Sequence, residues 1–330
     1  MIASTYVYIV LFIFGLISVL CAKKIGNLLS LVDSPDGYLK KHLTQTPSTG
    51  GLGIFTTIAV GTAFIFRGNL TSQHIVVIVF LLGIFTLGIL DDKLSLSVSI
   101  RLLTQVALVS MLLLFIDPFD LSGNIFLDFA VSAFFCLACI NALNILDIMD
   151  GLAGGVAFFA ILNCLLLFNS NVNFYTVISI CTLISLLAFL VFNFNPATIF
   201  MGDAGSTFLG GLIATLILIL FQQASTIQDK ISYFLPIAVM FFELMFVIIV
   251  RINKGLNPMR GSPDHLPLRL IRLGFSVKET VFIVYLFAAV CCILSIMINV
   301  SLLSAFPLLS IFCIILLFVG HRMAKIVMEP

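Results

Sequence analysis

The chain has 330 residues, of which 61% are hydrophobic and 9% are charged, and its formal net charge at pH 7 is +1. This composition excludes a water-soluble globular protein, because soluble domains carry many more charged residues. The near-neutral charge also gives no indication of a nucleic-acid partner. Lipid is therefore expected to be the main solvent of the chain.

Apolar stretches recur along the whole sequence and are separated by short polar breaks. Because a hydrocarbon core about 30 Å thick needs roughly 20 apolar residues per helix, each stretch predicts one membrane-spanning α-helix. We predict an all-α, polytopic membrane protein that forms a single domain over residues 1–330. Eleven spans are expected, at 4–22, 49–66, 74–90, 99–116, 125–143, 152–168, 174–192, 205–222, 231–250, 280–298 and 301–320.

The first span is expected to stay as an anchor and not to be cleaved as a signal peptide. The first six residues carry no positive charge, whereas Lys23 and Lys24 follow the apolar run. Lys and Arg also predict the orientation, because short loops rich in them remain cytoplasmic. With eleven spans, every Lys and Arg except Arg67 and Lys230 lies on one side. The N-terminus is therefore predicted outside and the C-terminus in the cytoplasm.

The first cytoplasmic loop, 32–51, contains Lys40 and His42 and ends in Gly50 and Gly51, which open the second span. A glycine-rich helix start can offer free backbone N–H groups to an anion. The loop is therefore either a phosphate-binding segment or an ordinary solvated loop that carries positive charge.

Asp91 and Asp92 end the third span, and Arg101 and Gln105 follow one helical turn apart in the fourth. Adjacent carboxylates at the end of an apolar helix repel each other unless a cation or hydrogen-bond donors compensate, and such residues indicate function. The alternative interpretation is that both carboxylates simply reach from the helix end to water.

Four polar residues recur every three positions at the end of the fifth span, at Asn141, Asn144, Asp147 and Asp150. On a continuous helix each step of three turns back by about 60°, so neighbours in the series lie side by side, whereas its ends lie half a turn apart. One helix would then contact two parts of a ligand.

The loop from Asn193 to Ser206 places Asp203 in a Gly-Asp-Ala-Gly turn before the eighth span. A carboxylate in a glycine-flanked turn suits a hard cation that takes oxygen ligands and keeps bound water. An ordinary helix cap fits the same pattern.

The last long loop, Arg251 to Lys278, is basic and contains His265 and Arg269. Its charge suits either a phosphate-rich ligand or anionic lipid headgroups. Taken together, the five loops place acidic and amide groups suited to Mg²⁺ on the same side as basic groups suited to phosphates. This combination is typical of phosphoryl transfer.

Four of these motifs, in this order, resemble the polyprenyl-phosphate N-acetylhexosamine-1-phosphate transferases, a family that also contains the phospho-MurNAc-pentapeptide translocases. The motifs are the loop with Lys40 and His42, the Asp91-Asp92 pair, the run NALNILDIMDGL and the loop FNFNPATIFMGDAGS. Within the family, the sequence is more similar to the branch that starts O-antigen, enterobacterial common antigen, teichoic acid or capsule chains than to the peptidoglycan translocases.

The resemblance implies a glycosyltransferase family 4 type domain in the plasma (inner) membrane with a cytoplasmic active site. A UDP-N-acetylhexosamine and undecaprenyl phosphate would give a polyprenyl-diphosphate sugar and UMP, with Mg²⁺ or Mn²⁺ as cofactor. The site residues that it implies are Asp91, Asp92, Asp147 and Asp150 as catalytic groups, Asp203 and Asn144 as metal ligands, and Lys40, His42, Asn141, Asn193, His265 and Arg269 as substrate-binding residues.

The sequence departs from the family pattern in the last loop, which usually carries an HxHH cluster after SPD. Here SPDHLPLRL keeps His265 and has Pro267 and Arg269 where further histidines are expected. A usual glycine is replaced by Ile148, and a usual membrane aspartate by Glu243, which is expected either to face the site or to pair internally. Since this loop is the one that would read the sugar, N-acetylglucosamine, N-acetylgalactosamine, N-acetylfucosamine and N-acetylquinovosamine all stay open.

Two other classes of membrane protein use carboxylates in a comparable way. An intramembrane aromatic prenyltransferase needs two Asp-rich motifs, but Asp92 is followed by Lys93 and no second motif matches. A secondary transporter or lipid flippase would place its binding residues near the bilayer midplane on broken helices. The carboxylates of this sequence lie at predicted helix ends, so the transferase is preferred and the transporter or flippase is kept as the alternative.

Overall fold

Polar residues between the apolar runs determine where many of the helices begin. The side chain of Thr71 accepts a hydrogen bond from the backbone N–H of His74 at the start of α3 (Ser72–Leu94), and Asn173 does the same for Thr176 at the start of α7 (Phe174–Asn193). Such an oxygen satisfies one of the backbone N–H groups that the first turn of a helix leaves unpaired. The capping residues therefore mark boundaries that apolar composition alone leaves open.

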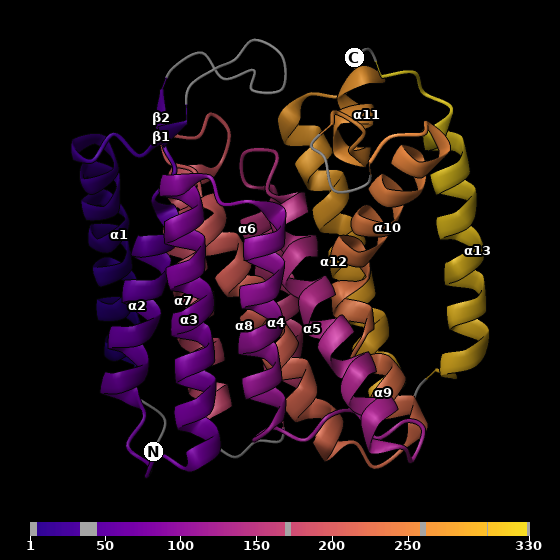
Figure 1. Ribbon diagram of the computed structural model, residues 1–330, viewed down its shortest axis with the longest axis horizontal. Helices are drawn as coiled ribbons and strands as arrows, with labels where there is room; N and C mark the ends of the chain where they lie inside the picture. The colour runs from indigo at the N-terminus through magenta and orange to yellow at the C-terminus, as the bar shows by residue number, and fades with distance from the viewer. Residues whose placement is uncertain (1–4, 34–44, 169–172, 258–261, 302, 329–330) are drawn as a thin grey trace.

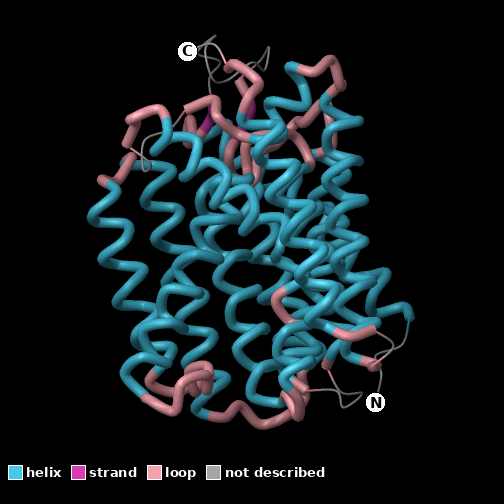
Figure 2. Tube along the Cα trace, turned by 90° about the vertical axis from the view of Figure 1, so that its right-hand side faces the viewer, coloured by secondary structure: helices cyan, strands magenta, loops and turns pink. Residues whose placement is uncertain are grey.

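The computed structural model describes residues 5–33, 45–168, 173–257, 262–301 and 303–328, and it shows a bundle of helices joined by loops at its two ends (Figures 1 and 2). The N- and C-termini lie at opposite ends of the bundle (Figure 1). The other helices are α1 (Thr5–Leu28), α2 (Gly50–Ile65), α4 (Val98–Leu113), α5 (Ile125–Leu146), α6 (Leu152–Leu167), α8 (Gly202–Gln223), α9 (Ile227–Ser232), the short 3₁₀ helix η1 (Leu235–Ile237), α10 (Ala238–Asn253), α11 (Leu266–Arg272), α12 (Val277–Asn299) and α13 (Ala305–Ala324).

Two short antiparallel strands close the first loop at the end of the bundle that also carries α11 (Figure 1). In β1 (Val32–Asp33) and β2 (Thr46–Pro47), Val32 lies opposite Pro47 and Asp33 opposite Thr46. Lys40 and His42 lie outside the described residues, so their assigned roles stay predictions.

Helix α8 forms the centre of the bundle, where it packs against α2, α3, α5 and α6. All residues from Ala204 to Phe221 are buried. Two glycines allow the close approach at its start, because a Cβ on Gly51 would lie 2.4 Å from the backbone N of Gly205, and one on Gly88 would lie 2.4 Å from the Cα of Ala204. Helices α2 and α3 therefore converge on the first turn of α8.

The all-α, polytopic class predicted from the sequence is confirmed. Eight helical segments of the described chain are long and apolar enough to cross a membrane, and the broken segment from α9 to α10 counts as one of them. The shorter apolar helices α2, α4 and α6 occupy the three remaining predicted spans. The total of eleven spans and the orientation in the membrane stay predictions.

Two segments differ from the continuous helices expected there. Pro236, which lacks a backbone N–H, lies in η1 and interrupts the predicted span 231–250 between α9 and α10. Helix α5 ends at Leu146, so Asp147 and Asp150 do not continue the helical series of Asn141 and Asn144. The expectation of one helix contacting two parts of a ligand is therefore wrong, because the chain turns at Asp147.

Candidate active site

The predicted acidic and amide residues meet where the end of α3, the end of α5 and the start of α8 come together. Asp92 on α3 accepts hydrogen bonds from the backbone N–H groups of Asp203 (2.9 Å) and Ala204 (3.1 Å). Its carboxylate therefore caps α8 and neutralises the positive end of that helix. Gly202, just before these groups, has φ +75° and a hypothetical Cβ 2.2 Å from the backbone O of Ser48, so the turn requires glycine.

Asp203 extends from the first turn of α8 toward the end of α5. Its Oδ1 accepts a hydrogen bond of 2.8 Å from Nδ2 of Asn144, and the same amide nitrogen lies 3.0 Å from Oγ of Ser206. These contacts fix the amide of Asn144 so that its carbonyl oxygen remains available as an acceptor. The two residues predicted as metal ligands therefore lie side by side, although they come from different helices.

Arg101 on α4 links the two carboxylates that flank this site. Its Nη1 lies 2.7 Å from Oδ2 of Asp91 and 3.7 Å from Oδ2 of Asp203. The Asp91 side chain is 7% exposed and also accepts a hydrogen bond from the backbone N–H of Leu96, whereas the Arg101 side chain is 33% exposed. Arg101 is thus a partly open cation at the centre of an acidic cluster. The sequence indicated that Arg101 lies one helical turn before Gln105, but it did not reveal that Arg101 lies between Asp91 and Asp203.

Asp147 lies at the turn after α5, outside the membrane-spanning helices. Burial raises its pKa to about 8, and the negative charges of Asp203, Asp92 and Asp150 contribute to this rise in the pKa. Four carboxylates thus crowd one small region. A bound cation would relieve this repulsion directly.

Asp150 and Asn193 connect the loops around the site through backbone groups. Oδ2 of Asp150 accepts hydrogen bonds from Nδ2 of Asn195 (2.9 Å) and from the backbone N–H of Ala197 (3.0 Å). Buried Asn193 accepts from the N–H of Gly151 and donates to the carbonyl of Ile199. Both side chains therefore hold the α5–α6 loop against the α7–α8 loop.

Asn141 lies one turn deeper on α5 than Asn144. Its Nδ2 donates to Oε1 of buried Gln105 (2.8 Å) and to the backbone O of Leu137 (2.8 Å). The hydrogen bond between Asn141 and Gln105 therefore joins α5 to α4, one helical turn beyond Arg101. Its assigned substrate contact stays a prediction.

His265 and Arg269, the remaining predicted residues, belong to a neighbouring cluster around α11. Nδ1 of His265 lies 2.9 Å from Oε1 of Glu243 on α10, and both side chains are buried. Of the two arrangements expected for Glu243, the structure shows internal pairing. The second ring nitrogen of His265, Nε2, is thereby left as the one available to a ligand.

Arg269 is fully buried and holds the end of α13. Its guanidinium donates to the carbonyl oxygens of Met323 and Ile326 and to the carboxylate of Asp264. Because the last turn of a helix leaves carbonyl groups unpaired, this residue acts as a C-terminal cap from a neighbouring helix. Arg269 therefore has a structural role at the end of α13, and its predicted role in substrate binding stays a prediction.

An apolar cavity of about 230 Å³ is enclosed by residues of α5, α10, α11, α12 and α13. Leu146, the last residue of α5, forms part of its wall, and Glu243 is the one charged residue among those that line it. Val239, Val284 and Phe287 also line it.

The oxygen donors of Asp203 and Asn144 suit a Mg²⁺ ion, which needs few protein ligands, better than a metal ion that is bound by protein side chains alone. In the described part of the chain, no group of three or more His, Cys, Asp or Glu side chains is arranged to hold a metal ion. Mg²⁺ commonly uses only one or two carboxylates and completes its shell with water and substrate phosphates. The oxygen atoms of Asp203 and Asn144, beside the crowded carboxylates, are ligands of that kind.

Comparison with known proteins identifies the family of this chain. Residues 74–221, from α3 to α8, match glycosyl transferase family 4. The chain is 30% identical over 329 residues to a probable undecaprenyl-phosphate N-acetylglucosaminyl 1-phosphate transferase of Bacillus subtilis, with 94% of this chain and 89% of that protein covered. It is also 28% identical to the undecaprenyl-phosphate alpha-N-acetylglucosaminyl 1-phosphate transferase of Haemophilus influenzae (87% and 85% covered) and 25% identical to that of Salmonella typhi (85% and 80%). A similarity that includes nearly the whole of both chains means that the protein belongs to glycosyl transferase family 4.

Proposed function

We propose that this chain transfers an N-acetylhexosamine-1-phosphate from a UDP-sugar to undecaprenyl phosphate and releases UMP. The observation that carries the proposal is the meeting of Asp203, Asn144, Asp147 and Arg101 at one end of a membrane-spanning bundle. The names of the relatives support both the acceptor and a sugar-1-phosphate as the transferred group. All four residues lie within the segment that matches the family.

In the proposed reaction, an oxygen of the acceptor phosphate attacks the phosphorus that bears the sugar. A new P–O bond forms, the bond from that phosphorus to the bridging oxygen breaks, and UMP leaves with the bridging oxygen. A phosphate monoester has a second pKa near 6, so much of the acceptor is already a dianion at neutral pH. A protein base is therefore not required, and Asp91, already engaged by Arg101 and Leu96, acts by holding the guanidinium in place.

Asp203 and Asn144 are the proposed ligands of a Mg²⁺ or Mn²⁺ ion, which when bound would neutralise charge on the diphosphate. Arg101 supplies a second positive charge and can take a phosphate oxygen on the part of its guanidinium that Asp91 does not engage. Asp147, whose pKa is raised to about 8, adds negative charge when it loses its proton, and a bound cation favours that loss. Asp92 positions the start of α8, and Asp150 positions the adjoining loops.

The apolar cavity beside Leu146 is proposed to receive the isoprenoid chain of the acceptor. Its lining of aliphatic and aromatic side chains suits a hydrocarbon, and Leu146, the residue before Asp147, forms part of its wall. Val284→Phe would fill this space. We expect the substitution to raise the KM for undecaprenyl phosphate about tenfold and to leave the KM for the UDP-sugar nearly unchanged; equal changes in both constants would argue against the assignment.

His265 is proposed to contact the sugar or its phosphate through Nε2, while Glu243 fixes the ring through Nδ1. The chain is further proposed to lie in the plasma (inner) membrane with eleven spans and the site on the cytoplasmic side. The relatives reported above all have transferase names, so they give no support to the transporter or flippase alternative.

A UMP-release assay tests the proposal. Purified protein is incubated with undecaprenyl phosphate, Mg²⁺ and each of several UDP-N-acetylhexosamines. UMP release should require the acceptor, the metal and one preferred donor. If no donor in the panel gives UMP above the level seen without acceptor, the transferase assignment is wrong.

A further inference from the structure

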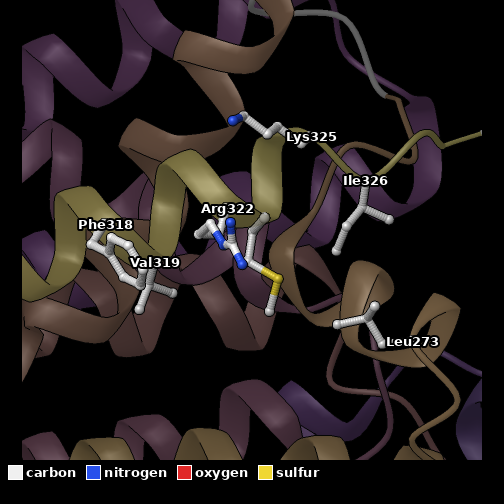
Figure 3. Close-up of a pocket in the computed structure, with 7 residues that line it drawn as sticks. Leu273, Phe318, Val319, Arg322, Lys325 and Ile326 are labelled. Carbon is white, nitrogen blue, oxygen red and sulfur yellow. The ribbon is translucent and has the colours of Figure 1, made fainter.

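A groove of about 570 Å³ lies where the end of α13 meets the end of α11, away from the acidic cluster. Figure 3 shows the side chains that line it, with Phe318, Val319 and Arg322 on α13 and Leu273 just beyond α11. Met323, Lys325 and Ile326 also line it. The groove thus joins an apolar surface to two cationic side chains.

The two cations are exposed and have no carboxylate partner in the part of the chain that the structure describes. Arg322 instead lies over the ring of Phe318, with 5.9 Å between Cζ and the ring centroid. Both charged residues that line the groove are positive. Both Arg322 and Lys325 would therefore attract an anion that fits the groove.

The position of α13 determines which anion can reach the groove. This helix lies at one edge of the bundle (Figure 1), and its apolar residues Ile314, Leu317 and Phe318 are 65%, 75% and 64% exposed. Such a surface faces lipid tails in a membrane protein. Arg322 and Lys325 follow in and just after the last turn, at the level where anionic headgroups lie.

Hydrogen bonds from Arg269 also connect the groove to α11. This buried side chain bonds the carbonyl groups of Met323 and Ile326, which flank Lys325, and it pairs with Asp264, the residue before His265. A ligand that holds Arg322 and Lys325 would therefore stabilise the same corner from its outer side.

We propose that this groove binds the phosphate headgroup of an anionic phospholipid of the surrounding bilayer, with Arg322 and Lys325 on the phosphate and Phe318, Val319 and Leu273 along an acyl chain. The substrate acceptor is a different lipid with a different destination, because its phosphate must reach Asp203 and Arg101. The two sites are neighbours, because Val319 and Met323 line both the groove and the apolar cavity proposed for the isoprenoid chain. They differ in the groups offered to the phosphate, which are Arg322 and Lys325 in the groove and Arg101 beside Asp203 in the candidate active site.

Native mass spectrometry of the purified full chain with dioleoylphosphatidylglycerol tests the proposal, with dioleoylphosphatidylcholine as the comparison lipid. Removing both cations in Arg322→Gln/Lys325→Gln should weaken phosphatidylglycerol binding about 30-fold, as expected for two basic groups at an anionic surface. Phosphatidylcholine binding should be unchanged. The matched control is Lys23→Gln/Lys24→Gln, which removes two charges near the end of α1, and it should bind phosphatidylglycerol like the parent chain.

Three outcomes would overturn the proposal. Equal affinity of the parent chain and the groove variant for phosphatidylglycerol would do so, as would equal affinity of the parent for both lipids. The third is displacement of phosphatidylglycerol by undecaprenyl phosphate together with a raised acceptor KM in the groove variant, which would make the groove part of the acceptor site. Thermal unfolding of both variants in phosphatidylcholine nanodiscs checks that the fold is retained. The lipid-binding measurements do not depend on transferase activity, which enters only through the acceptor KM of the third outcome.

Discussion

The start of α8 and the corner between α11 and α13 both collect charged side chains at one end of the bundle, but the two regions balance charge differently. At the corner, burial alone would raise the pKa of Asp264, yet hydrogen bonds from Lys254 and Ser262 and the charges of Lys254 and Arg269 hold that pKa below its usual value. At the start of α8, carboxylates crowd together and the pKa of Asp147 rises to about 8. The buried carboxylate of the corner is paired with cations of the chain, whereas the carboxylates at the start of α8 leave room for a bound cation.

The family match divides the molecule at a similar place, although the Bacillus subtilis relative is similar over 94% of this chain. The match to glycosyl transferase family 4 covers α3 to α8 and therefore the acidic cluster, and it ends before α10, α11 and α13. We infer that reaction chemistry resides in the first region and that the second, apart from the proposed contact of His265 with the substrate, mainly supports the bundle. Substitutions in the two regions should therefore separate loss of turnover from loss of stability.

Asp203→Asn should give the largest effect. The amide keeps the shape of the side chain and can still accept the hydrogen bond from Asn144, but it loses the charge proposed to hold the metal ion. We expect turnover at saturating substrates to fall about 10³-fold, as measured by UMP release. Asp117→Asn, at an exposed position after α4, is the matched control. Near-normal turnover of the Asp203 variant would exclude it as a metal ligand.

Arg101→Gln should have the next largest effect on turnover. Loss of the guanidinium removes a positive charge proposed to bind phosphate and leaves Asp91 without its partner. We expect kcat/KM for the UDP-sugar to fall about 10²-fold, with partial recovery in Arg101→Lys, which restores charge but not the forked geometry. Lys93→Gln removes an exposed charge from the end of α3 and serves as the control. Equal losses in both variants would indicate a general effect of surface charge.

Much of the fold could be predicted from the sequence, because apolar length and helix caps are local signals. The positions of all eleven predicted spans coincide with helices or, for 231–250, with a broken helical segment. The turn at Asp147 could not be predicted, since the three-residue spacing of its polar groups is equally compatible with a continuing helix. Tertiary packing of the following loop against Asn193 and Asn195 decides this point.

The acidic part of the site could also be predicted, because carboxylates at the ends of apolar helices are costly and usually mark a functional position. The contacts that these carboxylates make with other residues could not be predicted. That Asp92 caps α8 and that Arg101 bridges Asp91 and Asp203 depends on contacts between residues far apart in the sequence. In the basic last loop, the positive charge suggested a ligand-binding residue, but it did not reveal that Arg269 is buried against the end of α13.

Arg269→Gln should sharpen the comparison by affecting stability more than catalysis. The substitution removes a buried cation from Asp264 and from the carbonyl groups at the end of α13. We expect the free energy of unfolding to fall by about 3 kcal/mol in an SDS titration of mixed micelles. Arg272→Gln, an exposed position on the same helix, is the matched control. A large rise in the UDP-sugar KM without loss of stability would instead support the substrate-binding role predicted from the sequence.

The smallest effect expected is a pH dependence of metal binding. With its pKa raised to about 8 in the metal-free protein, Asp147 is largely protonated at pH 6 and 7, and a cation near Asp203 must displace that proton. Apparent Mg²⁺ affinity should therefore rise with pH, by at most about tenfold per unit, and level off above pH 8. Calorimetry in two buffers that differ in ionisation enthalpy would detect the released proton directly. Asp147→Asn should reduce this slope between pH 6 and 8 while Asp203 still binds the ion. An unchanged slope in the variant would show that another group carries the proton.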